Sequence, residues 1–491
     1  MPAKPQSIAR GVLLFVAILG FVVLCFIAGV RPAWTAQQAE PAPKQEILGA
    51  WQGTLKLGGI ELRVVLKIAR NEQGQYQATL DSPDQGAKGI PVAAFSREGN
   101  EITADIKRVA GFYTGTLADN GTEIKGKWKQ AGQELALDLK RLDKEPDYRR
   151  PQDPQQPYPY RAEEVTYTND SAKVTLAGTL TLPTSDRPVP AVLLISGSGP
   201  QDRDEALLGH RPFLVLADHL TRRGIAVLRV DDRGVGGSSG NTMTSTTDDV
   251  AGDVLAGVAY LKTRGEIDPK HIGLIGHSEG GLVAPLAASR SADVAFIVLM
   301  AGTGVTGDEI VYRQGELIAQ AAGADAAAVA KSRDAQKRLF EIAKQESDPA
   351  KAEQRIREAI SEVIAKEVGS PEARKGAEAQ VAAQAKVILT PWFRYFLTYD
   401  PLPALRKVRC PVLAINGEKD LQVDPAQNLP PIETALKEAG NADFTVKVFP
   451  GLNHLFQHCQ TGSPTEYGRI EETISPEVLE LIAGWIAEHT K

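Results

Sequence analysis

The chain has 491 residues, of which 43% are hydrophobic and 24% are charged, a composition typical of a folded protein with two or three domains. Its formal net charge is −6, so the chain has no excess of basic residues, which argues against nucleic acid as a partner. The three cysteines, Cys25, Cys410 and Cys459, are too few for a disulfide framework, and no C-x-x-C pattern predicts a zinc site. We expect Cys410 and Cys459 to be buried free thiols, with a disulfide between them as the alternative in an exported protein.

The N-terminus carries two basic residues followed by an uncharged apolar stretch, Gly11–Val30. This stretch is longer than the apolar region of a typical signal peptide and, as a helix, matches the thickness of a membrane. Residues 1–36 therefore predict export to the periplasm or the extracellular space, as a cleaved signal peptide or as a helical membrane anchor. Cleavage after Ala36 would place Trp34 where a small residue is preferred, so both alternatives stay open. The polar residues 37–47 are typical of a tether.

A small all-β domain is predicted for residues 48–143. Short segments there alternate apolar and polar residues, and turn sequences such as "NEQGQ", "REGN" and "DNG" separate them. Regularly spaced segments of this kind indicate an antiparallel sandwich or barrel. We expect Trp51 and Trp128 to fill its core rather than to stack on a ligand, and the segment contains no catalytic constellation.

Five prolines between Glu145 and Tyr160 predict a stiff, extended linker over residues 144–161. Strand-like and helix-like segments then alternate over residues 162–491, and the strand-like segments, such as "VPAVLLIS" and "VAFIVLMAG", are continuously apolar. This pattern predicts an α/β fold, a doubly wound, mostly parallel sheet with helices on both faces.

The alternation is interrupted at about residues 305–395 by a block rich in Ala, Glu, Lys and Gln with helical periodicity. We expect this block to form a helical cap over the carboxyl ends of the strands, where α/β sheets bind ligands. A solvated helical bundle with no role in the site is the alternative.

The pattern G-x-S-x-G, which can mark a nucleophilic serine, occurs twice, around Ser238 and around Ser278. A nucleophile elbow needs a strand that ends directly before the serine and a helix that begins directly after it. The strand-like "HIGLIG" ends at Gly276 and the helix-like "EGGLVAPLAAS" begins at Glu279, whereas Ser238 lies in a loop beyond a strand end. This context predicts that Ser278 is the nucleophile.

A serine hydroxyl needs a histidine as base, and the base needs an acid that orients it. His454 is the candidate base because it follows the strand-like segment "FTVKVFP", at the carboxyl edge of the predicted sheet. Asp420 is the candidate acid because it stands just beyond the preceding strand, whereas Asp424 precedes a proline and is expected to cap a helix. A metal site of His454, His458 and Cys459 is a weaker alternative, since no further ligand lies nearby in the sequence.

Acyl transfer also needs two preorganised backbone N–H groups that bind the oxyanion. The first expected donor is Glu279, directly after the nucleophile, and the second is Ser198 in "LLISGSGPQDRDE", where glycines on either side give the backbone room. A phosphate-binding loop is a weaker interpretation of "SGSGP", which lacks the lysine of a P-loop and the full G-x-G-x-x-G. No metal ion or cofactor is predicted.

Together these motifs resemble the α/β-hydrolase family from about Glu163 to the C-terminus. The segments "SGSGPQDRDE", "DDRGVGGSSG", "GHSEGG", "GEKDLQV" and "LNHLFQ" are similar to those of bacterial esterases in the serine-aminopeptidase-like subgroup, some of which carry a β-rich N-terminal domain. The resemblance implies a serine esterase acting on short-chain acyl esters, and places Ser238 in a structural turn. The implied site residues are the triad Ser278, Asp420 and His454 and the oxyanion-hole residues Ser198 and Glu279.

Other functions stay open at this point. An aminopeptidase or amidase, or a thioesterase or acyltransferase, would use the same triad on the same scaffold. A surface-tethered binding protein would use the β domain and leave the hydrolase domain inert, and an ordered triad argues against it. The expected partner is a small-molecule ester, with the membrane as a further partner if the N-terminal segment is uncleaved; the sequence leaves the oligomeric state open.

Overall fold

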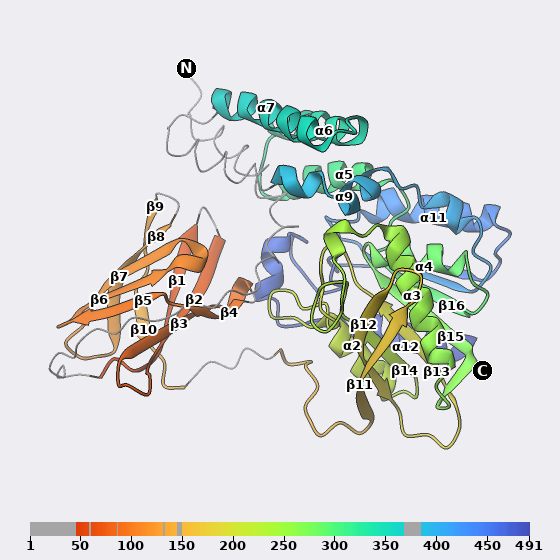
Figure 1. Cartoon of the computed structure of the whole chain (residues 1–491), viewed down its shortest axis with the longest axis horizontal. Coiled ribbons are helices and arrows are strands. Elements are labelled where there is room, and N and C mark those ends of the chain that lie inside the picture. Colours follow the sequence, from red (N-terminus) through yellow and green to blue (C-terminus); the bar gives the residue numbers. More distant parts are fainter. Residues whose placement is uncertain (1–45, 58–59, 86, 131–132, 145–149, 368–383) are drawn as a thin grey trace. The chain divides into compact units, whose positions relative to one another are not determined.

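The structure is a computed structural model that describes residues 46–57, 60–85, 87–130, 133–144, 150–367 and 384–491 (Figure 1). The described residues form two compact units, one made mainly of the chain up to Arg150 and the other mainly of the chain from Pro151 onward. The apolar stretch Gly11–Val30, and with it the predicted signal peptide or anchor helix, lies outside the described residues. None of the helices within them is long and apolar enough to cross a membrane.

The first unit is an antiparallel sheet with the strand order β4-β3-β2-β1-β10-β8-β7-β6-β5, and β9 pairs with β8. β4 and β5 lie at opposite ends of this order, yet only Val92 and Ala93 separate them in the chain. The N–H of Val92 donates to Ala78 in β3 at 3.1 Å, and the N–H of Ala93 donates to Asp105 in β6 at 2.7 Å. These bonds bring the two edge strands together at one corner of the sheet, as in the predicted antiparallel sandwich or barrel. The strands are β1 (Gly49–Leu57), β2 (Ile60–Arg70), β3 (Tyr76–Ser82), β4 (Ala87–Pro91), β5 (Ala94–Glu98), β6 (Glu101–Ile106), β7 (Gly111–Leu117), β8 (Glu123–Gln130), β9 (Gln133–Ala136) and β10 (Leu139–Arg141).

The alternating apolar residues of this unit point into one core, as the period of two in a strand requires. Trp51 is fully buried and Trp128 is nearly so, which confirms that both tryptophans are core residues. The indole N–H of Trp51 is satisfied by the carbonyl of Ile47 at 2.8 Å. The strands β4 and β5 were not anticipated, because each has only five residues and neither forms a long alternating run.

The second unit is built on an eight-stranded sheet with the order β11-β12-β14-β13-β15-β16-β17-β18. The pairs from β14 to β18 are parallel, whereas β11 and β12 form an antiparallel edge. The central strands are buried on both faces, which explains their continuous apolar sequences and confirms the predicted α/β fold. The strands are β11 (Arg161–Asn169), β12 (Val174–Leu182), β13 (Val189–Ile195), β14 (Ala226–Val230), β15 (Ile267–His277), β16 (Phe296–Met300), β17 (Val412–Gly417) and β18 (Phe444–Phe449).

Helices cover both faces of this sheet, and each face has its own apolar core. One core holds buried residues of α2 and α12, and the other holds buried residues of α3, α4, α10 and α11. Helix starts are marked by local signals, such as the capping box between Thr246 and Asp249 before α3. The helices are α2 (Pro212–Thr221), α3 (Thr247–Lys262), α4 (Gly280–Ala288), α10 (Leu402–Leu405), α11 (Pro425–Glu438) and α12 (Pro476–His489).

The second half of the Pro-rich segment is bound to the α/β unit. The side chain of Gln152 donates to the carbonyl of Ile474 at 2.7 Å, and buried Asp153 pairs with Arg211 at 2.7 Å. These contacts fix the chain from Pro151 onward, so this part of the predicted linker belongs to the α/β unit.

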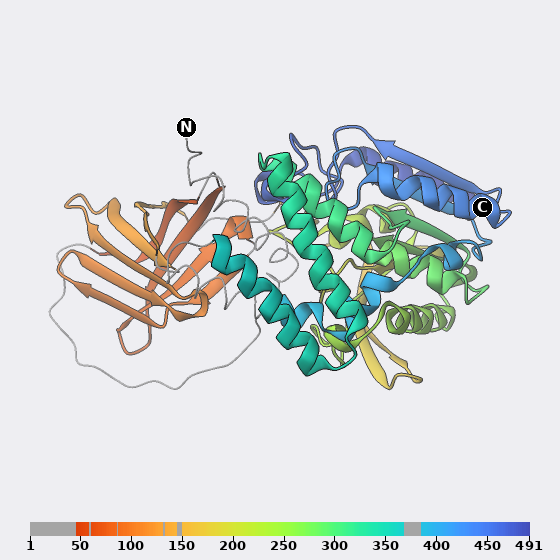
Figure 2. The same ribbon diagram turned by 90° about the horizontal axis from the view of Figure 1, so that it is seen from above.

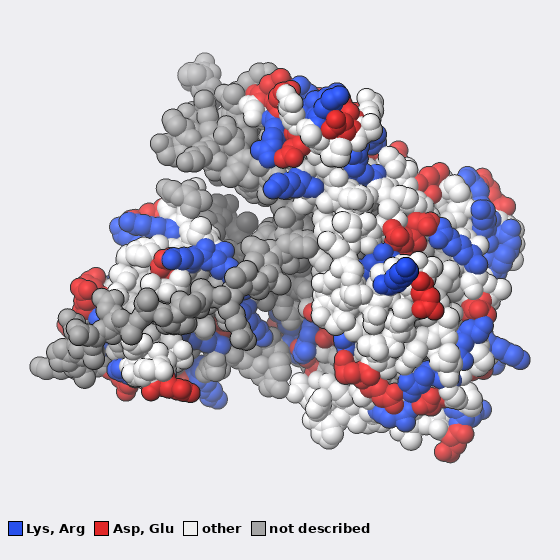
Figure 3. Space-filling view, viewed as in Figure 1, with Lys and Arg blue, Asp and Glu red and all other residues white. Residues whose placement is uncertain are grey.

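The predicted helical insertion is present between β16 and β17. Its helices α5 (Gly307–Ala321), α6 (Ala326–Gln345), α7 (Pro349–Glu367) and α9 (Pro391–Thr398) lie over one end of the sheet, with α6 and α7 side by side (Figures 1 and 2). This cap has its own apolar core, which includes Phe340, Trp392 and Phe396. Charges of both signs are interspersed on its outer surface (Figure 3), as in the pair between Arg338 and Glu362.

Candidate active site

Ser278 lies at the turn between β15 and α4, with a backbone φ of +54°. Residues other than glycine rarely adopt this left-handed backbone conformation, so the turn is strained. The flanking glycines are required, because a Cβ on Gly276 would lie 2.0 Å from the carbonyl oxygen of Gly280, and one on Gly280 would lie 2.1 Å from that of Ile195. The N–H of Ser278 donates to Met300 in β16 at 2.9 Å. This strained strand-to-helix turn has the geometry of a nucleophile elbow.

Ser238, at the centre of the other G-x-S-x-G, has a different environment. Its side chain is buried, its hydroxyl donates to the carbonyl of Asp231 at 2.7 Å, and it accepts from the N–H of Ala177 at 2.9 Å. The first contact holds the loop together and the second ties it to β12, so this serine is structural.

His454 and Asp420 form a buried pair at the ends of the last two strands. Nδ1 of His454 lies 2.8 Å from Oδ2 of Asp420, and the two residues are only 4% and 2% exposed. The other carboxylate oxygen of Asp420 accepts the N–H groups of Gln422 and Val423, both at 2.8 Å. Asp420 is placed to accept a proton from Nδ1, and in that tautomer Nε2 is the ring nitrogen that can accept a proton.

The elbow and the His454 loop come together through His277, the residue directly before Ser278. Nε2 of His277 lies 3.1 Å from the carbonyl oxygen of His454, and the centres of the two imidazole rings are 4.8 Å apart. The structure therefore places Ser278, Asp420 and His454, which come from three separate loops, at the same edge of the sheet.

The loop after β13 lies against the elbow. A Cβ on Gly197 would be 3.2 Å from the Cβ of Ser278, which shows how closely the two backbones approach. Asp232 holds this loop by accepting the hydroxyl of Ser196 at 2.8 Å and the N–H of Gln201 at 2.9 Å. Ser198 directly follows Gly197, so the loop that carries it lies against the elbow.

Glu279, the other expected oxyanion donor, is buried at the start of α4, where a first-turn N–H has no intrahelical acceptor. Its carboxyl group accepts the indole N–H of Trp392 at 3.0 and 3.1 Å, and bonds the hydroxyls of Thr247 and Ser198. Burial raises the pKa of Glu279, and these donors oppose the rise. One side chain thus connects the elbow, the Ser198 loop, α3 and the cap.

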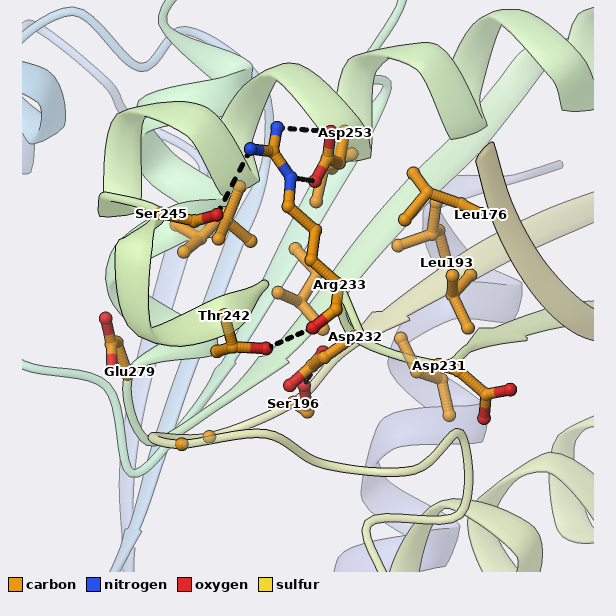
Figure 4. A pocket seen from close by; sticks show the side chains of 18 of the residues that line it. Leu176, Leu193, Ser196, Asp231, Asp232, Arg233, Thr242, Ser245, Asp253 and Glu279 are labelled. Atoms are coloured by element: carbon orange, nitrogen blue, oxygen red, sulfur yellow. Dashed lines mark hydrogen bonds and ion pairs between the residues drawn. The ribbon is translucent and has the colours of Figure 1, made fainter. Parts of the chain in front are cut away.

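A cavity of about 70 Å³ lies beside the Ser198 loop and reaches Glu279 (Figure 4). Arg233 extends to Asp253 and Ser245 along one wall, and Asp232 contacts Ser196 on another (Figure 4). Burial raises the pKa of Asp232 to about 8, so this carboxyl group is mainly neutral at pH 7. The rest of the lining combines apolar side chains with the ion-paired groups of Asp231, Arg233 and Asp253.

The alternative assignments are not supported by the contacts. His458 pairs with Glu472 at 2.9 Å and Cys459 donates to the carbonyl of Gly451, so they turn to different partners from His454. No group of three His, Cys, Asp or Glu side chains within the described ranges could hold a metal ion. Asp424 caps α11, as predicted, by accepting the N–H of Ala426. Cys410 and Cys459 are free and half-buried.

Three residues that shape the site were missed by sequence reasoning. Glu205 and His277 lie inside motifs that were recognised, but no pattern indicates that they contact each other. Trp392 lies in the cap, and only its aromatic character distinguishes it from its neighbours.

A family model, a curated relative and solved structures are similar to this chain. Residues 192–466, more than half of the chain, match the alpha/beta hydrolase family. Esterase EstD of Thermotoga maritima is 25% identical over 464 residues, which cover 90% of this chain and 98% of that protein. The structure of the Pyrococcus furiosus esterase Pf2001 is similar with a TM-score of 0.41 and 17% identity, over 68% of this chain and 92% of that one. The structure of Est1E from Butyrivibrio proteoclasticus with bound ferulic acid has a TM-score of 0.36 and 17% identity, over 66% of this chain and 96% of that one. The chain belongs to the α/β-hydrolase family.

Proposed function

We propose that this protein is a serine esterase that hydrolyses carboxylic esters with short acyl chains through an acyl-enzyme on Ser278. The observation that carries the proposal is the strained elbow at Ser278, next to a buried His454–Asp420 pair held at 2.8 Å. The name of the Thermotoga relative, esterase EstD, supports ester hydrolysis. The resemblance of the site segments to those of bacterial esterases supports a short acyl chain.

In the proposed acylation step, the hydroxyl oxygen of Ser278 attacks the ester carbonyl carbon while Nε2 of His454 takes the hydroxyl proton. Asp420 stabilises the imidazolium that forms. The oxyanion receives hydrogen bonds from the N–H groups of Ser198 and Glu279. The bond to the alcohol oxygen then breaks, and His454 returns the proton to the departing alcohol.

In the proposed deacylation step, His454 takes a proton from a water molecule, whose oxygen attacks the acyl carbon. The tetrahedral intermediate is again stabilised by the same two N–H groups. When the bond to Ser278 breaks, the serine oxygen regains a proton from His454 and the carboxylic acid leaves. These steps require no metal ion or cofactor.

Labelling with a fluorophosphonate probe tests the nucleophile. The wild-type protein should be labelled and Ser278→Ala should not. The matched control is Ser238→Ala, which removes the other G-x-S-x-G hydroxyl and should keep the label. An unlabelled wild-type protein, or a labelled Ser278→Ala, would contradict the proposal.

A second assay distinguishes the esterase from an aminopeptidase. An aminopeptidase needs a carboxylate that is free to bind the substrate amine, which the cap would have to supply. The carboxyl group of Glu279, next to the elbow, is already engaged by three donors. We therefore expect p-nitrophenyl esters to be cleaved, with kcat/KM falling as the acyl chain lengthens, and aminoacyl anilides to be poor substrates. Preference for the anilides would overturn the assignment.

We also propose that the protein is exported, on the strength of the apolar stretch Gly11–Val30 and the basic residues before it. Fractionation of the producing cells should place the activity outside the cytoplasm. N-terminal sequencing of that fraction then distinguishes a cleaved signal peptide from a retained anchor.

A further inference from the structure

The side chain of His277 is buried between two hydrogen-bond acceptors. Its Nδ1 lies 2.9 Å from Oε1 of Glu205, and its Nε2 lies 3.1 Å from the carbonyl oxygen of His454. A ring nitrogen donates a hydrogen bond only when it carries a proton. Both contacts are therefore hydrogen bonds only if His277 is an imidazolium with a proton on each nitrogen.

The carboxylate oxygen of Glu205 that faces Nδ1 of His277 also accepts a second hydrogen bond. Oε1 of Glu205 accepts the N–H of Gly197 at 2.7 Å as well as the contact from His277. A proton on Oε1 would disrupt these two bonds, and buried Oε2 has no partner among the described residues to which a proton could be donated. Two donors favour the charged carboxylate, and a buried imidazolium beside it compensates its charge.

These contacts join three loops of the site. Gly197 belongs to the loop that carries Ser198, His277 to the end of β15, and His454 to the loop after β18. We propose that Glu205 and His277 form a buried carboxylate–imidazolium pair that positions the Ser198 loop and the backbone of His454 around Ser278. The proposal rests on the proposed function, and both members are positioning residues because neither contacts the reacting atoms.

The surroundings of the pair are consistent with this role. Glu205 has a φ of +51°, a strained value for a glutamate that the surrounding contacts must maintain. The adjoining small cavity is otherwise lined by apolar residues, namely Pro212, Phe213, Met300, Leu455, Phe456 and Ile474. Among the residues that the structure describes, the titratable groups that act on His277 besides Glu205 are His454 and Asp420. Burial alone would lower the pKa of His277, but Glu205, the His454 carbonyl and Asp420 together raise it.

Two variants, each of which removes one charge of the pair, test the positioning role. In Glu205→Gln, the amide oxygen must face the N–H of Gly197, and the negative charge that stabilises the imidazolium is lost. A neutral His277 carries one ring proton, so it can donate to only one of its two acceptors. In His277→Gln, the ring and its charge are lost. We expect either change to lower kcat by about 10- to 100-fold, as displaced supporting groups do, with KM changed less than about threefold. His271→Gln is the matched control, since His271 pairs with Asp268 at the far end of the same strand, and it should retain wild-type kcat.

A nitrogen NMR spectrum of histidine side chains gives a readout that a purely structural role would not predict. At about pH 7.5, one unit above the ordinary pKa of histidine, both ring nitrogens of His277 should show the shifts of protonated nitrogens. The resonances are assigned by their absence in His277→Gln. In Glu205→Gln, the same ring should show one protonated and one unprotonated nitrogen at that pH.

The outcomes separate this inference from the proposed function. A wild-type His277 with an unprotonated nitrogen at about pH 7.5, or wild-type kcat in both variants, would overturn the pair. If the wild-type protein fails to react with fluorophosphonate, the esterase proposal fails, whereas the spectrum still decides the charge state of His277.

Discussion

Nδ1 of His454 lies 2.8 Å from Oδ2 of Asp420, and the opposite oxygen of that carboxylate is held by two backbone N–H groups. In Asp420→Asn, the amide oxygen must face these N–H groups, so the amide NH₂ faces Nδ1. His454 would then carry its proton on Nε2 and could not accept the proton of Ser278. We expect kcat for a p-nitrophenyl ester to fall by about 10⁴-fold with the fold unchanged.

The control for this variant is Asp268→Asn, which alters a half-exposed aspartate that pairs with His271 at the same distance of 2.8 Å. It should keep wild-type kcat. If Asp420→Asn loses less than about tenfold, Asp420 is not the residue that orients His454.

The contact between Trp392 and Glu279 predicts a change in stability. Trp392→Phe removes the indole N–H that both oxygens of the buried carboxyl group accept. An under-satisfied buried polar group costs about 1–3 kcal/mol, which should appear as a lower free energy of unfolding in urea. The loss should shrink as the pH falls, because a protonated Glu279 depends less on the donor. Trp485→Phe is the control of equal size, since the indole N–H of buried Trp485 has no hydrogen-bond partner among the described residues.

The raised pKa of Asp232 predicts a pH dependence of stability. Burial raises this pKa from 3.8 to about 8 in the folded protein. Between these two values the folded state binds a proton that the unfolded chain has lost, so the contribution of Asp232 to the free energy of unfolding decreases as the pH rises. In Asp232→Asn, the amide oxygen still accepts from Gln201 and the NH₂ donates to Ser196, so this decrease should disappear. Urea unfolding of both proteins at several pH values measures the difference, and parallel pH profiles would contradict the prediction.

Gly→Ala changes at a closely packed site in the elbow and at an open site in α12 are expected to have opposite effects on stability. A Cβ on Gly280 would lie 2.1 Å from a backbone oxygen, whereas a Cβ on exposed Gly484 in α12 meets nothing within 4 Å. Gly280→Ala should strongly reduce the free energy of unfolding or the yield of folded protein. Gly484→Ala should raise the free energy of unfolding by about 0.5–1 kcal/mol, because alanine favours the helix. Thermal and urea unfolding measure both changes.

The two G-x-S-x-G sequences show what a motif can decide. The pattern itself does not distinguish Ser278 from Ser238, but the strand before Ser278 and the helix after it do, because both elements leave local signals in the sequence. The same reasoning located Asp420 and His454, since each follows an apolar strand directly. The structure adds the positive φ of Ser278 and the two backbone contacts of the Ser238 hydroxyl.

By itself, the sequence determined the β-rich and α/β units, the helical insertion and the order of the site residues, because burial and helix or strand periodicity are local properties of a chain. Only the tertiary structure decided that His277 contacts Glu205, 72 residues earlier, and His454, 177 residues later. It also decided that Trp392 in the cap satisfies Glu279, 113 residues away. Such contacts depend on which loops converge at the carboxyl edge of the sheet, and no periodicity in the sequence records that convergence.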